Sequence, residues 1–358
     1  MTEILLTIFF ISVLLIFLGS GIWVAISMVG VSSIGMMLFT TRPVGDAMAT
    51  TIWGASSSWT LTALPLFVWM GEILFRTKLS ENLFEGLSPW MQKLPGGLVH
   101  VNVVGCALFA AISGSSAATV ATVGKMSIPE LRKRKYPESI LLGSLAGSGT
   151  LGLLIPPSII LIIYGVTVQE SIAKLFIAGI VPGIMIALIF MTYVMIWSLI
   201  NKKSMPTFKQ DFSLMEKVRK SGKLIPVILL IVSVIGSIYT GIATATEAAS
   251  LGVVGALILS YFQKSLSLRT FKESLLGATK TSCMIAFILA GATFLSLAMG
   301  FTGLPRNLAL WIEGMELSPY VLIFVLMIFY IILGMFLDGI SAVVLTMAII
   351  EPMIRQAG

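Results

Sequence analysis

Apolar stretches of about 20 residues alternate with short polar segments along the whole chain. A helix of that length crosses the roughly 30 Å hydrocarbon core of a bilayer, so each stretch predicts a membrane helix. These stretches are residues 4–23, 24–41, 62–75, 173–200, 224–240, 241–262, 274–300 and 320–337. The pattern predicts an all-α integral membrane protein.

Two further apolar stretches contain residues that a continuous membrane helix avoids. The sequence Gly-Ser-Ser at 114–116 interrupts residues 98–124, and a Gly- and Pro-rich sequence at 147–157 interrupts residues 140–167. Backbone groups freed at membrane depth need partners from protein, ions or a water-filled cavity. The pattern therefore predicts a helical hairpin with its tip at 113–116, a broken helix facing it, and a binding site between them.

Polar segments separate these stretches. Residues 79–94 have apolar side chains at three- and four-residue spacing, which predicts an amphipathic helix at the membrane surface. Residues 124–139 are expected to form a polar loop, and residues 201–223 are expected to separate two halves of the chain. Tryptophans at 53 and 59 place residues 40–61 at the membrane interface, and residues 301–317 are interpreted in the same way.

Composition excludes a soluble protein, because 57% of residues are hydrophobic and 11% are charged, against about 25% charged in soluble domains. The net charge of +7 does not indicate nucleic-acid binding. Of the 23 Lys and Arg residues, 18 lie in segments 76–97, 125–138, 201–223 and 263–272. Cytoplasmic loops carry such an excess of basic residues. On this assignment the first hairpin enters from the cytoplasm.

An internal repeat is indicated when the chain is aligned with itself at an offset of 225 residues. This offset pairs Gly114 with Gly339 and Ser116 with Ser341. The charge pattern places the two elbows on opposite faces, as expected for inverted repeats with two re-entrant hairpins. The partner of Pro156 would fall beyond the last residue, so we expect a second half without its broken helix, in a truncated or partly covered chain.

Five longer motifs stand out in the sequence. They are GSSAATVATVGKMSIPELRKRKYPES (114–139), GSLAGSGTLGLLIPPSI (143–159), AKLFIAGIVPGI (173–184), LPLFVWMGEIL (64–74) and TGIATATEAASLGVVGAL (240–257). Together they resemble one transporter family, the large membrane subunit of tripartite ATP-independent periplasmic (TRAP) transporters. The resemblance runs from about residue 61 to 354. It departs from the family at the C-terminal end, where the family has a second Pro-Pro break.

The resemblance implies sodium-driven import of an organic acid, of C4-dicarboxylate or sialic acid type, across the bacterial inner membrane. It also implies a small four-helix membrane subunit, a periplasmic substrate-binding protein and an elevator motion. The corresponding division of the chain is a first scaffold with arm helices, a transport core, a connection, a second scaffold and an incomplete second core. These parts comprise residues 1–97, 98–168, 169–223, 224–318 and 319–358.

The candidate site residues are small and rich in oxygen, because sodium prefers hard oxygen ligands such as the carbonyls and hydroxyls of unwound tips. The first sodium site is predicted at Ser113, Ser116, Gly149, Gly152, Ile155 and Pro157, and the second at Asp338, Gly339 and Ser341. Substrate contacts are predicted at Ser115, Ser158 and Asp338. The alternatives are close packing of helices by small residues and, for Asp338, capping of a helix.

Three other charged residues are open to two interpretations. Glu72 and Glu247 could form buried ion pairs or lie at helix ends near water, and Arg306 could attract an anion or contact a lipid phosphate. The remaining loop Lys and Arg residues are interpreted as topology determinants and contacts to anionic membrane lipids.

Competing functions remain open at this stage. The nearest is a stand-alone sodium–carboxylate symporter that needs no binding protein, and a passive channel is another. A membrane enzyme is disfavoured, since the chain has a single histidine, His100, and no HExxH sequence. No cofactor is expected apart from Na⁺ as coupling ion.

Overall fold

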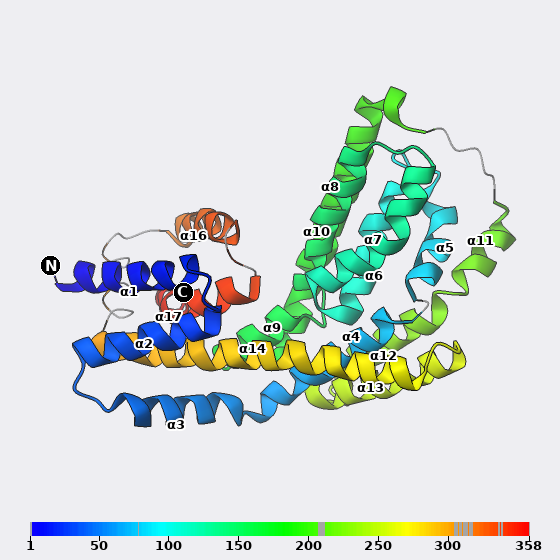
Figure 1. The fold of residues 1–358 in the computed structure, drawn as a ribbon. Helices are drawn as coiled ribbons and strands as arrows, with labels where there is room; N and C mark the ends of the chain where they lie inside the picture. The colour runs from blue at the N-terminus through cyan, green and yellow to red at the C-terminus, as the bar shows by residue number, and fades with distance from the viewer. Residues whose placement is uncertain are drawn as a thin grey trace. The chain divides into compact units, whose positions relative to one another are not determined.

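In the computed structural model, the regular structure of the described residues is entirely helical (Figure 1). The described residues are 2–77, 79–206, 212–303, 307, 310, 314, 318–335, 337 and 339–357. They form two compact units. Unit 1 comprises residues 1–61, 163–170 and 282–358, and unit 2 comprises residues 62–162 and 171–281. The prediction of an all-α fold is confirmed. The five-part functional division stays a prediction.

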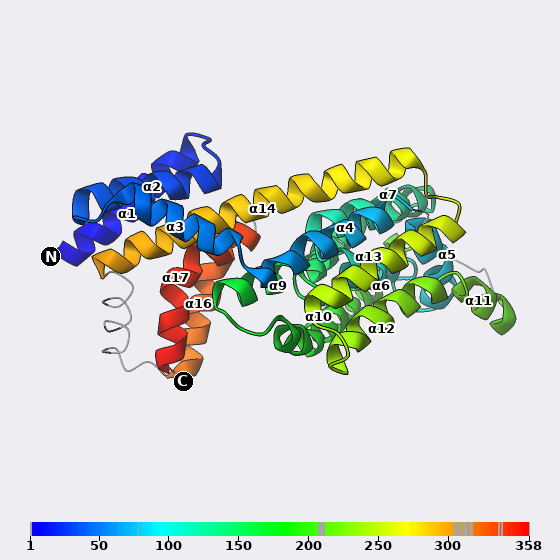
Figure 2. The same cartoon turned by 90° about the horizontal axis from the view of Figure 1, so that it is seen from below.

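Unit 2 is a bundle built around a helical hairpin. In Figure 1, α6, α7 and α8 lie side by side, and Figure 2 shows α4 next to α13. The helices of unit 2 are α4 (Ala63–Phe75), α5 (Leu79–Met91), α6 (Val99–Ser113), α7 (Ser116–Lys133), α8 (Glu138–Gly149), η2 (Thr150–Leu153), α10 (Ile172–Ile200), η3 (Lys202–Ser204), α11 (Leu214–Ser221), α12 (Ile225–Tyr239) and α13 (Ala245–Phe262).

Unit 1 contains the N-terminal helices and a second pair of packed helices near the C-terminus. Its helices are α1 (Thr2–Gly19), α2 (Val24–Phe39), α3 (Val44–Ser56), α16 (Pro319–Gly334) and α17 (Gly339–Ala357). The short helix η1 (Trp59–Thr62) lies where the two units meet in the sequence. Helices α9 (Ile159–Thr167) and α14 (Leu268–Thr302) each contribute residues to both units.

Three helices of the described chain are long and apolar enough to cross a membrane, namely α10, α13 and α14. Two bent pairs also pass as single spans by length and composition. One is α3 with the segment 59–75, and the other, within unit 2, is α11 with α12, which meet at a bend of 54°. Several side chains on these helices are both apolar and exposed, including Val181 at 73% and Ile200 at 77%. Such surfaces are expected where a multi-pass membrane protein faces lipid.

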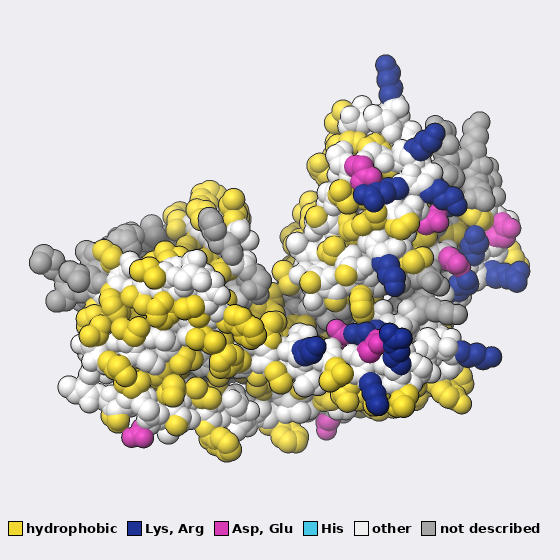
Figure 3. Space-filling view, in the orientation of Figure 1, with side chains coloured by type: hydrophobic (Ala, Val, Ile, Leu, Met, Phe, Trp, Pro, Cys, Tyr) yellow, Lys and Arg dark blue, Asp and Glu magenta, His cyan; other side chains and the backbone are white. Residues whose placement is uncertain are grey.

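Basic side chains are concentrated in one unit. On the face drawn in Figure 3, hydrophobic side chains form large patches on unit 1, whereas Lys and Arg side chains gather on unit 2. The polar segments 125–138 and 201–223, which contain 12 of the 23 basic residues, belong to unit 2.

Two boundaries predicted from the sequence are wrong. The expected loop 124–139 is helical as far as Lys133, because Ser127 and Leu131 are buried on one face of α7 and Glu130 pairs with Arg134 one turn later. The span predicted at 274–300 begins earlier, because α14 runs without interruption from residue 268. The basic side chains near both boundaries lie on solvated faces of helices, so their charge does not mark where a helix begins or ends.

Candidate ion and substrate site

The tip of the first hairpin lies between α6 and α7. Helix α6 ends at Ser113, and Gly114 follows with φ of +60°, a left-handed conformation that glycine adopts at little cost. Helix α7 begins at Ser116, and the Ser115 side chain accepts a hydrogen bond from the Ala118 N–H at 3.4 Å. The Gly-Ser-Ser sequence thus ends one helix and starts the next within two residues.

Buried hydroxyl groups fix the conformation of this tip. The Ser113 hydroxyl lies 3.0 Å from that of Thr119, and Thr119 also donates to the Ser115 carbonyl at 2.7 Å. Ser113 and Thr119 are 5% and 0% exposed. The Ser113 Oγ also accepts from the Ser115 N–H at 3.4 Å. The tip is therefore held from inside by its own side chains.

The hairpin tip packs directly against the break between α8 and α9. The Ile159 N–H donates to the Gly114 carbonyl at 3.3 Å. A methyl group at Gly114 would lie 2.8 Å from the Pro157 carbonyl oxygen. A methyl group at Gly152 would lie 2.9 Å from the Ser115 carbonyl carbon and oxygen. Only residues without a β-carbon allow these two backbones to approach so closely.

Several carbonyl groups at the tip and at the break have no hydrogen-bond donor among the described residues. They are those of Ile112 and Ser113 at the end of α6, and of Ile155, Pro156 and Pro157 in the break. In addition, the two prolines carry no N–H group. Backbone carbonyls left open in a buried setting need another partner, such as water or a cation.

The structure therefore brings together most of the predicted first sodium site. Gly152 contacts the backbone of residues 115–116, and Pro157 contacts Gly114. A methyl group added at Gly149 would lie 3.8 Å from the Ser116 carbonyl oxygen. The Ser113 side chain points into the hydroxyl network of the tip. Ser158, a predicted substrate contact, is buried and donates to the Leu153 carbonyl at 2.5 Å.

A buried polar cluster supports this arrangement behind the tip. Asn102 of α6 donates to the Ser144 hydroxyl at 3.0 Å and to the Leu141 carbonyl at 3.3 Å, and Ser148 contacts the Asn102 carbonyl at 3.4 Å. These bonds join α6 to α8. Asn102 and Thr119 were not among the predicted site residues, although a polar residue in an apolar stretch could have indicated each of them.

The second pair of packed helices, α16 and α17, lies in unit 1. Tyr330 and Thr346 are linked by a hydrogen bond of 2.6 Å between their hydroxyls, and Met347 and Ile350 form a small buried cluster with Val168. Gly339 begins α17. Ser341 is 1% exposed on its first turn. Asp338, predicted for both sodium and substrate, lies outside the described residues, as does Arg306.

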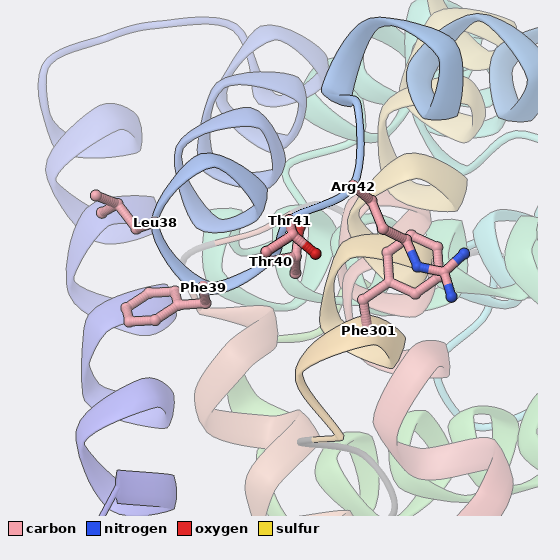
Figure 4. Close-up of a pocket in the computed structure, with 6 residues that line it drawn as sticks. All are labelled: Leu38, Phe39, Thr40, Thr41, Arg42 and Phe301. Carbon is pink, nitrogen blue, oxygen red and sulfur yellow. The ribbon is translucent and has the colours of Figure 1, made fainter.

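Unit 1 also contains two cavities that the sequence analysis did not predict. One, of about 650 Å³, is lined by Thr and Ser hydroxyls of α3, η1 and α14 together with the segment 165–170. The other, of about 500 Å³, lies beside Thr40 and Thr41 (Figure 4). Figure 4 shows the Arg42 side chain over the Phe301 ring, with the guanidinium 4.5 Å from the ring centroid.

The two acidic residues with open interpretations differ in their surroundings. Glu72 pairs with Arg76 at 3.2 Å, and Arg76 also pairs with Glu273 of α14 at 3.0 Å, so Glu72 belongs to a partly buried ion-pair group. Glu247 lies at a helix end. Its carboxylate accepts from the Thr244 N–H at 2.8 Å and completes a capping box at the start of α13.

Comparison with protein families decides the class of protein. The model of the tripartite ATP-independent periplasmic transporter DctM component matches residues 10–358. The chain belongs to this family. It is therefore a multi-pass membrane subunit of a transporter, and its family is not one of enzymes.

Three characterised relatives of this DctM-family permease show the range of the similarity. The C4-dicarboxylate TRAP transporter large permease protein DctM of Pseudomonas aeruginosa is 33% identical, covering 90% of this chain and 75% of the relative. The isethionate TRAP transporter permease protein DctMQ of Oleidesulfovibrio alaskensis is 30% identical, covering 96% and 54%. The sialic acid TRAP transporter large permease protein SiaM of Vibrio cholerae is 29% identical, covering 95% and 79%.

Proposed function

We propose that this permease imports a small organic acid anion together with Na⁺, which binds where the hairpin tip meets the break. The family supports transport, and the open carbonyls at both sides of that contact support a cation. Oxygen ligands without fixed charge suit an alkali-metal ion at membrane depth, because no unpaired carboxylate is then left in the membrane when the ion departs.

The helix ends near the contact between tip and break also favour a cation and an anion there. Helix α6 and the α8–η2 segment both end beside it, and the C-terminal end of a helix carries partial negative charge that attracts a cation. Helix α7 begins there, and its N-terminal N–H groups favour an anion. A cation at the carbonyls and an organic anion near Ser115 and Ser158 would therefore stabilise each other.

The second sodium site is proposed at Asp338, Gly339 and Ser341, on the elbow that precedes α17. The two hairpins are proposed to be inverted repeats that enter from opposite faces and move together in an elevator cycle. The close contact between the first hairpin tip and the break supports a rigid first half of this core, because Gly114 and Gly152 leave no gap between the two segments.

Relatives named for C4-dicarboxylates and for sialic acid indicate substrates of those two types. The tripartite family description supports a small membrane subunit, proposed to have four helices, and a periplasmic binding protein that delivers the substrate. The DctMQ relative is longer than this chain, which covers 54% of it, and that additional length supports the proposal of a small subunit. The proposed location is the bacterial inner membrane.

Uptake by proteoliposomes tests the proposal. The permease is reconstituted with its small subunit, and uptake of a labelled C4-dicarboxylate or sialic acid is measured with and without the binding protein. We expect uptake that requires an inward Na⁺ gradient and the binding protein. Equal uptake with a K⁺ gradient would refute sodium coupling. Undiminished uptake without the binding protein would identify a stand-alone symporter.

A further inference from the structure

A separate cavity of about 290 Å³ lies in unit 2, at the end of α10 and away from the hairpin tip. The turn at 94–97 forms one wall, residues 198–206 form another, and Tyr136 lies between them. Since a water molecule occupies about 30 Å³ in the liquid, the cavity has room for a polar group the size of several waters. No proposed ion or substrate residue lines it.

Hydrogen-bond donors in this cavity lack acceptors among the described residues. Ser198 is 5% exposed, and its hydroxyl has no partner there; the buried Gln92 amide nitrogen has none either. The Tyr136 oxygen accepts from the Leu98 N–H at 3.1 Å, which leaves the phenol proton unused. Burial raises the pKa of Tyr136, so this proton is retained at neutral pH. Lys202 adds a positive charge on the same wall.

The backbone carbonyls of the turn at 94–97, in contrast, are already used. The Leu94 carbonyl accepts from the Gly97 N–H at 2.8 Å, and the Pro95 carbonyl accepts from the His100 ring at 2.8 Å. The carbonyls of residues 96 and 97 accept from the first N–H groups of α6. No Asp or Glu lines the cavity within the described part of the chain. Free side-chain donors, one cation and a turn whose carbonyls are already used favour an oxyanion ligand.

The position of the cavity favours a lipid as the source of this oxyanion. Helix α10 has 29 residues and so is about 43 Å long, more than the roughly 30 Å hydrocarbon core, which places its end at the level of the headgroups. Leu199 and Ile200 at that end are 49% and 77% exposed. The basic segments 125–138 and 201–223 assign this end to the cytoplasmic leaflet, which contains anionic lipids.

We infer that this cavity binds the phosphate group of an anionic phospholipid of the cytoplasmic leaflet. Ser198, Gln92 and Tyr136 donate hydrogen bonds to the phosphate oxygens, and Lys202 neutralises the charge. The apolar side chains of Leu199 and Met205 line the same cavity and contact the glycerol end of the lipid. The site is independent of the proposed sodium and substrate sites.

Lipid titration of the full-length purified permease tests this inference. Delipidated protein in detergent is titrated with dioleoyl-phosphatidylglycerol, and bound lipid is counted by native mass spectrometry. Lys202→Gln removes the cation. Ser198→Ala removes a hydroxyl that has no partner among the described residues, so we expect the fold to stay intact. Lys203→Gln is the matched control, because Lys203 is the exposed neighbour and does not line the cavity.

We expect affinity for phosphatidylglycerol to fall about tenfold or more in Lys202→Gln and in Ser198→Ala, since each loses a hydrogen bond to a charged group. Lys203→Gln should change it less than twofold. Equal affinities in all four proteins would overturn the inference, as would equal binding of phosphatidylcholine. Stabilisation by inorganic phosphate alone, lost in Lys202→Gln, would overturn the lipid as the source of the oxyanion.

Discussion

A single methyl group at Gly152 should separate the hairpin tip from the break. In Gly152→Ala this methyl group would lie 2.9 Å from the Ser115 carbonyl carbon and oxygen and 3.0 Å from the Ser116 nitrogen. Favourable contacts between carbon atoms lie near 3.5–4.0 Å. All three neighbours are backbone atoms, so no side chain can rotate away and the tip itself must move.

The cost of this movement can be estimated from overpacked sites in protein interiors, where an added methylene group costs about 1–3 kcal/mol. If that cost falls on the ion-bound arrangement, the apparent sodium affinity falls by a factor of roughly 5–150. Gly143→Ala is the matched control. Gly143 lies on α8, which ends at Gly149, and a methyl group added at Gly143 would have no neighbour within 4 Å.

The assay is sodium-dependent uptake by proteoliposomes, with the sodium concentration for half-maximal rate as the readout. A melting curve without sodium shows whether each variant is folded. We expect Gly152→Ala to need at least fivefold more sodium and Gly143→Ala to match the wild type. A wild-type sodium requirement in folded Gly152→Ala would refute the argument that tip and break form one site.

Three further predictions concern stability and titration. Ser113→Ala should lower the free energy of unfolding by about 1–2 kcal/mol, seen as a lower melting temperature, because a buried hydroxyl pair is lost. An unchanged melting temperature would contradict a structural role for this pair. Arg76→Gln should cost roughly 1 kcal/mol, because its ion pairs are partly exposed, whereas Lys280→Gln should cost nothing measurable. The exposed Arg132 guanidinium lowers the pKa of Glu138. This pair therefore stabilises the fold at neutral pH, and its contribution disappears as pH falls through that lowered pKa. Arg132→Gln should return the Glu138 pKa, measured by carboxyl NMR, to its ordinary value.

Much of the fold follows from the apolar pattern and from helix breakers. Gly114 at φ of +60° is where the sequence predicted the hairpin turn, and α8 ends at Gly149 as the glycine-rich sequence indicated. Both positions are local, because a left-handed residue or a proline ends a helix whatever surrounds it. That is why the tip and the break were predicted correctly.

Helix ends in charged segments were harder to predict. Helix α7 continues through the basic sequence to Lys133 because Leu131 is completely buried against the rest of the bundle. A tertiary contact of this kind leaves no trace in local composition. Asn102 and Thr119 differ from this case, because each is a polar residue in an apolar stretch. Their partners, however, depend on how the helices pack.

Neither the sequence pattern nor the helix packing determines which residues bind an ion or the substrate. The same small residues that bring the tip to the break would do so in a tightly packed hairpin without an ion. The open carbonyls of the break favour the proposal of a bound ion, because packing alone leaves them without partners. The roles of Gly339 and Ser341 rest on the proposed repeat, and Asp338 lies outside the described residues.

The central claim is that carbonyls of the hairpin tip and of the break bind one cation. Cryo-electron microscopy maps of the full-length permease in sodium chloride and in choline chloride test it most directly. We predict a density between Ser113 and residues 155–157 in sodium chloride that is absent in choline chloride. A tip and break with the same geometry and no such density in either salt would contradict the claim.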